Sequence, residues 1–129
     1  MNTDKKIIEI IDELIELGNK VLTTRRSPGY GVIAGDVVDK FLASQWLTRT
    51  QSLVLRVFGE DSIYFNNIKN LVGERLGTSF GIYHGDCIKI LGILMAAKND
   101  YEHGYLFDVK KLIEADIFVD FLDQAETLL

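Results

Sequence analysis

The chain has 129 residues, about the size of one ordinary domain, and 47% hydrophobic and 26% charged residues, as in a globular protein. This composition excludes a wholly disordered chain. The single cysteine, Cys87, excludes an internal disulfide and a four-cysteine zinc site. A net charge of -5 argues against general nucleic-acid binding, which needs a strongly cationic surface. We therefore expect one domain over residues 1–129.

Charge is distributed unevenly along the chain. Residues 1–19 and 100–129 are acidic, whereas residues 20–98 carry more lysine and arginine than acid. Solvated helix faces explain the acidic ends, and the basic middle leaves a local anionic partner open. The N-terminal sequence lacks a signal-peptide pattern, and no stretch reaches the roughly 18 apolar residues of a membrane span. Together with one free cysteine, these features predict a cytoplasmic protein without a membrane partner.

Residues 4–22 place apolar side chains at helical spacing, with acids between them. The pattern predicts an amphipathic helix, and Asn2, Thr3 or Asp4 is suited to cap it. The apolar arc is broad, which is typical of a core or interface helix. It consists of Ile7, Ile8, Ile10, Ile11, Leu14, Ile15, Leu17, Val21 and Leu22.

Residues 23–35 form the clearest loop, because they hold the only proline and three glycines. A second helix is predicted over residues 36–58, where apolar residues return at helical spacing and Asp36 supplies the first position. Gly59 follows directly and suits the end of that helix.

Ser62 is expected to cap a third helix over residues 63–72. A fourth helix, which begins at about Tyr83 or Asp86 and ends at Ala97, is apolar nearly all round, so we expect it at the centre of the fold. Gly92 in its middle costs roughly 1 kcal/mol relative to alanine. Close approach of another helix at Gly92 would be a sufficient reason for this cost.

Residues 99–107 are predicted to be an aromatic-rich turn, in which Gly104 adopts a positive φ. A last helix over residues 108–129 carries apolar residues on one face and acids on the other. No sustained alternation of period two indicates a sheet. The sequence therefore predicts an all-α, single-domain bundle of about five helices.

His84, Asp86 and Cys87 stand close together in the sequence. A thiolate and an imidazole at this spacing suit a shared metal or a nucleophile–base pair. A buried cysteine that behaves as a small hydrophobic residue is the simpler interpretation. We therefore expect no metal and no cofactor.

Five further side chains are candidates for binding a ligand. Arg25 and Arg26 lie in a glycine-rich loop that matches no nucleotide-binding fingerprint, and they can hold an anion or simply be solvated. Asp100, Glu102 and His103 have the groups of acid–base chemistry, although such a turn more often caps a helix. We assign no catalytic residue. The alternative function is a small sensor or enzyme for an anionic or nucleotide ligand, in which both groups line one cleft.

Two segments resemble a helical domain found in many uncharacterised bacterial proteins. The first is a helix with an internal tryptophan, Trp46, that ends in FGEDS (residues 58–62), with the aromatic residues Tyr64 and Phe65 shortly after it. The second is GILMAAKNDYEHGYLF (residues 92–107) with the acidic helix after it. Together they cover about half of the chain, and His103 departs from the family pattern, which has a small residue there.

In this family the helical unit precedes a second domain, often in proteins of phage defence or mobile elements. The resemblance implies an accessory module without an assigned catalytic residue, with a second domain after Leu129 or encoded next door. We therefore expect a non-enzymatic module that binds a protein or associates with itself as a homo-oligomer. A mobile-element protein that covers a host protein's surface is a third hypothesis. The expected interface residues are Ile7, Ile11, Leu14, Phe118, Phe121 and Leu122.

Overall fold

The computed structural model describes residues 2–29, 35–75, 81–104, 117, 119, 120 and 122–124. These residues are mostly helical, which confirms the all-α class. Four long helices follow one another in this part of the chain: α1 (Asn2–Leu22), α2 (Lys40–Phe58), α3 (Ile63–Arg75) and α4 (His84–Glu102). By its internal contacts the chain divides into two compact units, Met1–Ala97 and Lys98–Leu129, and each is described by itself. A single domain over residues 1–129 stays a prediction.

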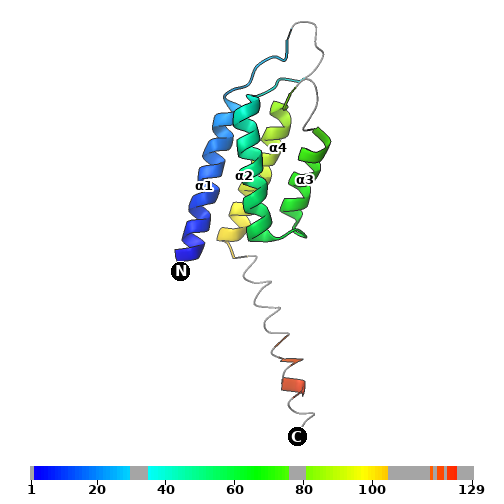
Figure 1. The fold of residues 1–129 in the computed structure, drawn as a ribbon. Coiled ribbons are helices and arrows are strands. Elements are labelled where there is room, and N and C mark those ends of the chain that lie inside the picture. The colour runs from blue at the N-terminus through cyan, green and yellow to red at the C-terminus, as the bar shows by residue number, and fades with distance from the viewer. Residues whose placement is uncertain are drawn as a thin grey trace. The chain divides into compact units, whose positions relative to one another are not determined.

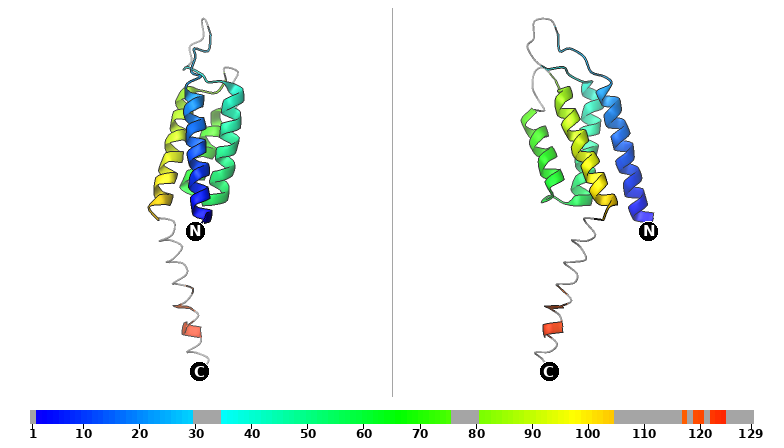
Figure 2. Two further views of the ribbon diagram at one scale, coloured as in Figure 1. Left: turned by 90° about the vertical axis from the view of Figure 1, so that its left-hand side faces the viewer. Right: turned by 180° about the vertical axis from the view of Figure 1, so that it is seen from behind.

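In the first unit, consecutive helices run in opposite directions and lie side by side (Figure 1). Seen from behind, α4 lies in front of α2, and both stand between α1 and α3 (Figure 2). The connections that precede α2 and α4 meet at one end of the bundle, where the N–H of Val38 donates to the carbonyl of Ile82 over 3.0 Å. This arrangement is that of an up-and-down four-helix bundle.

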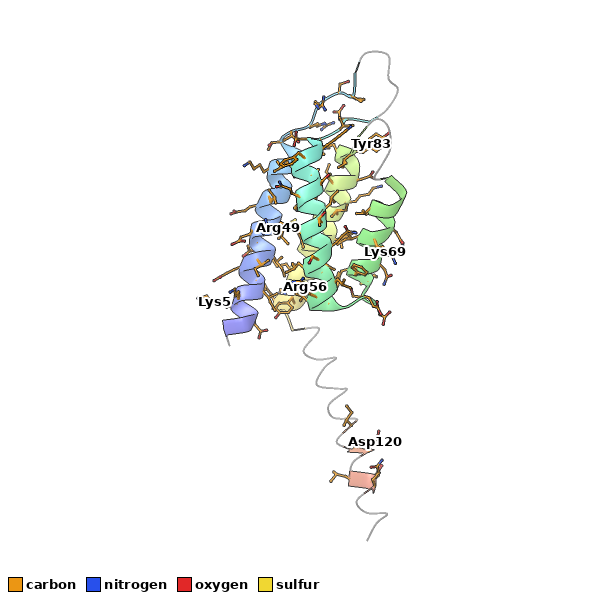
Figure 3. All side chains as sticks on the ribbon, viewed as in Figure 1. Lys5, Arg49, Arg56, Lys69, Tyr83 and Asp120 are labelled. Atoms are coloured by element: carbon orange, nitrogen blue, oxygen red, sulfur yellow. The ribbon has the colours of Figure 1, made fainter. Side chains whose placement is uncertain are left out.

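The predicted first helix is confirmed, and most of its apolar arc is used inside the first unit. Ile11, Leu14 and Val21 are buried, whereas Glu9, Glu13 and Glu16 on the opposite face are exposed. At the surface between α1 and α2, the Arg49 guanidinium lies 3.9 Å from the Glu13 carboxylate, and both side chains are exposed (Figure 3). Burial rather than this ion pair therefore holds α1, since exposed pairs contribute about 0–1 kcal/mol.

The centre of the core is a contact between Trp46 of α2 and the backbone of α1. The indole N–H of Trp46 donates to the carbonyl of Leu14 over 2.8 Å, and both side chains are buried. Gly18 makes room for the ring, because a Cβ there would stand 2.7 Å from a Trp46 ring carbon and 2.9 Å from a Leu91 methyl group. Only a residue without a side chain lets the indole lie this close to the helix.

The start of α2 corrects the sequence prediction. The helix begins at Lys40, and Asp39 caps it by accepting the N–H of Leu42 over 2.8 Å. Asp36 lies before the helix, in extended chain where Val37 forms isolated β-bridges with Arg26 and Tyr83. Val37 is therefore buried by backbone pairing to two other segments rather than by a helix face.

Other helix ends follow the sequence more closely. Gly59 adopts φ 92° and donates its N–H to the Leu55 carbonyl, as expected for a helix end. Ser62 accepts the N–H of Phe65 over 3.1 Å, which confirms the cap of α3. Gly104 has φ 75° as predicted, but α4 continues to Glu102. The predicted turn therefore starts too early, because residues 99–102 include no helix breaker.

α4 has a buried face and an exposed one. Its inward residues are Cys87, Ile90, Leu91, Leu94 and Ala97, whereas Ile88 and Met95 are exposed. Gly92 lies on the exposed face, and apart from its chain neighbours and the backbone of its own helix no described atom comes within 4 Å of where its Cβ would stand. The close approach expected at Gly92 is therefore not made in the described part of this chain.

Candidate functional site

Arg25 and Arg26 lie where the connections meet at the end of the bundle. The Nε of Arg25 donates to the Asp36 carboxylate over 2.6 Å, and both side chains are substantially exposed. Arg26 is held by its backbone, which exchanges two hydrogen bonds with Val37. Thr24 fixes the same turn, because its hydroxyl accepts the N–H of Asp39. The charge of Arg25 is thus balanced by a carboxylate, which lowers its attraction for an anion.

Asp100, Glu102 and His103 belong to the second unit. Glu102 pairs with Lys98 one helical turn earlier, at 3.5 Å. The Nδ1 of His103 lies 2.7 Å from the carbonyl of Asn99. Since a carbonyl only accepts, Nδ1 carries the proton. The cleft that would join these side chains to the arginines stays a prediction.

Cys87 is buried at the start of α4. Burial and the negative charge of the neighbouring Asp86 raise the pKa of the Cys87 thiol to about 11. The thiol is therefore protonated at neutral pH, and a protonated thiol is a poor nucleophile. A cavity of about 10 Å³ beside it, lined mainly by apolar groups such as Leu47 and Ile90, has room for about one water molecule.

In the described ranges no group of three or more His, Cys, Asp or Glu side chains could hold a metal ion.

The interface residues expected from the sequence have different surroundings. Ile11 and Leu14 are core residues of the first unit and offer no surface to a partner, and Ile7 is half-buried. Leu122 is exposed in the second unit. Phe118 and Phe121 lie outside the described residues.

Around Leu122 the described residues of the second unit are helical and exposed. Two further large apolar side chains, Ile117 and Val119, share this exposure. Asp120 and Asp123 are exposed beside them, and Figure 3 labels Asp120. This segment therefore combines apolar and acidic surface over a short length.

A groove of about 580 Å³ lies between α3 and α4. Leu71, Gly92 and Ile93 form its apolar part, and the side chains of Asn67, Asn70 and Lys89 are its polar part. The sequence prediction missed this groove. Its only sequence signal is Gly92, which predicted a close helix contact without indicating on which side of α4 that helix lies.

Comparisons with protein-family models, with curated proteins and with solved structures gave no match for this chain. In the part of the chain that the structure describes, no helix has the length and apolar character needed to cross a bilayer.

Proposed function

We propose that this chain is a non-enzymatic helical module that associates with other copies of itself through residues 117–124 of its second unit. The observation that carries the proposal is the exposure of three large apolar side chains there. Ile117 is 63%, Val119 53% and Leu122 44% exposed. Large apolar residues that gather at the surface of a short segment are typical of interaction sites.

The packing of α1 in the first unit also supports this proposal. The core of this unit already encloses Ile11, Leu14 and Val21 of α1, and the other apolar residues of that arc are half-buried, so much of the arc leaves water without a partner. The acids of residues 117–124 keep the exposed segment soluble until a partner covers its apolar side chains. An accessory module of this kind fits the resemblance to bacterial multidomain proteins, and the single buried thiol fits a cytoplasmic setting.

The proposal is tested by measuring mass in solution with size-exclusion chromatography and light scattering. We expect the wild-type chain to exceed its monomer mass of 14.6 kDa at micromolar concentration. Leu122→Asp places a charge within the proposed interface, where it is desolvated without a partner, and should give the monomer mass. The matched control is Gln45→Asp, which adds the same charge at an exposed position of α2, outside the proposed interface segment.

A wild-type chain that stays monomeric over the whole accessible concentration range contradicts the proposal. Equal loss of mass in Leu122→Asp and Gln45→Asp also contradicts it, because the effect would then come from added charge alone.

A further inference from the structure

The groove between α3 and α4 has a composition that selects its ligand. Its apolar part is formed by Leu71 and Ile93, with Gly92 leaving the backbone of α4 open. Its described polar lining consists of the amides of Asn67 and Asn70 and the ammonium of Lys89, and no carboxylate lines it among the side chains that the structure describes. Amides and an ammonium offer N–H donors to carboxylates. The groove therefore suits a helix that is apolar on one side and acidic beside it.

Gly92 gives a second reason to place a helix on this surface. Glycine weakens the middle of a helix relative to alanine. At Gly18 the contact with Trp46 explains the missing side chain, but at Gly92 no described atom lies within 4 Å of a Cβ position. A helix from another molecule that crosses α4 at Gly92 would use this space.

The second unit contains a segment with the matching chemistry. Val119 and Leu122 are exposed and one helical turn apart, so their side chains point the same way. Asp120 and Asp123 have the same spacing and form an adjacent acidic edge. An apolar edge with an acidic edge beside it is thus complementary in chemistry to a groove that combines Leu71 and Ile93 with Lys89 and two amides.

We infer that the α3–α4 groove of one copy receives Val119, Asp120, Leu122 and Asp123 from the second unit of another copy. This inference rests on the proposed self-association and names the surface that receives the segment. The contact joins two different surfaces, so it is heterologous, and each copy offers one groove and one segment. Self-association by this contact continues from copy to copy, as a closed ring or as an open chain.

A heterologous contact can be tested by mixing two variants. Gly92→Glu fills the groove and adds a charge that repels the acidic segment, whereas Leu122→Asp disables the segment and leaves the groove intact. Each variant alone should be monomeric. An equal mixture should form a species of two monomer masses, because one groove and one segment remain complementary. Light scattering after size-exclusion chromatography measures both results.

The matched control for the groove is Gly73→Glu, which makes the same change at an exposed glycine of α3 with nothing described within 4 Å. Gly73 does not line the groove, so this variant should associate like the wild type. Thermal unfolding of Gly92→Glu should occur at or above the temperature of the equally monomeric Leu122→Asp variant, which shows that a lost contact is not lost folding.

The outcomes distinguish failure of this inference from failure of the proposed self-association. If Gly92→Glu associates like the wild type while Leu122→Asp does not, self-association stands and the groove is not its receptor. If both variants are monomeric and their mixture is too, the contact is not heterologous and the inference is overturned. If the wild type is itself monomeric, the proposed function fails and the inference fails with it.

Discussion

Gly18 and Gly92 each lie inside a long helix of the first unit, and the structure gives them opposite surroundings. At Gly18 the position of a Cβ is within 3 Å of both Trp46 and Leu91, whereas at Gly92 nothing described lies within 4 Å. Glycine weakens the helix at both positions. The same residue type therefore permits a filled contact between α1 and α2 and leaves an open groove between α3 and α4.

This difference teaches that a glycine inside a helix is informative only together with what faces it. The contact at Gly18 is complete within the chain, because the indole fills the space and bonds to the Leu14 carbonyl. The groove at Gly92 is incomplete within the described residues and is therefore a candidate for an external partner. Three measurements test the two sides of this comparison.

The largest loss of stability is expected when the Trp46 side chain, which packs against Gly18, is removed. Trp46→Ala removes the largest buried side chain of the core and should lower the free energy of unfolding by about 3–5 kcal/mol. Trp46→Phe keeps much of the volume but leaves the Leu14 carbonyl without its indole donor, so its loss should be smaller. Urea denaturation followed by circular dichroism measures both. A loss below about 1 kcal/mol in Trp46→Ala would show that the contact is not central.

The buried face of α4, opposite Gly92, can be tested by alkaline pH. The thiol of Cys87 has a reference pKa of 9.0, and in the folded chain its pKa is raised to about 11. Above pH 9 the unfolded chain loses this proton while the folded chain keeps it. The stability contributed by the protonated thiol is thus full below pH 9 and falls between pH 9 and 11, by about 2–3 kcal/mol.

Cys87→Ala supplies the control for this pH dependence. It should unfold more easily at neutral pH, because a buried sulfur is removed, but should lack the additional loss between pH 9 and 11. Identical alkaline slopes in the variant and the wild type would assign the loss to other groups.

The smallest and most direct test compares alanine at the two glycines. Gly18→Ala should destabilise by about 1–2 kcal/mol, because overpacking against Trp46 outweighs the better helix propensity. In the monomeric Leu122→Asp background, Gly92→Ala should stabilise by up to about 1 kcal/mol, because the methyl group meets open space there. Chemical denaturation measures the change in the free energy of unfolding in both variants. If both alanines stabilise or both destabilise the chain, the two glycines do not differ as described.

Much of the helical fold could be predicted because it depends on local periodicity. The span of α1, the Gly59 helix end and the Ser62 cap all follow from residues close in sequence. The start of α2 could not be predicted, because Val37 pairs with Tyr83, a residue far along the chain. Without that pairing, Asp36 and Asp39 are equally suited by residue type to cap α2.

Which apolar residues form an interaction surface also could not be predicted from local sequence alone. Leu122 belongs to a predicted interface helix, and its exposure is consistent with that role. Ile11 and Leu14 have the same pattern but lie in the core, since only the packing of α2 decides whether an apolar arc is covered. For glycine the sequence indicated Gly92 as the tight contact, whereas the tight contact is at Gly18, because its cause is a tryptophan on another helix.

Trp46 is the only tryptophan in the chain, and it is fully buried against α1. Its fluorescence therefore comes from a single place in the molecule. While the indole is shielded by α1, a dissolved quencher has little access to it, and separation of α1 from α2 exposes it to both quencher and water. The opening of this one contact can thus be followed optically and without a label, independently of the helix content that circular dichroism records.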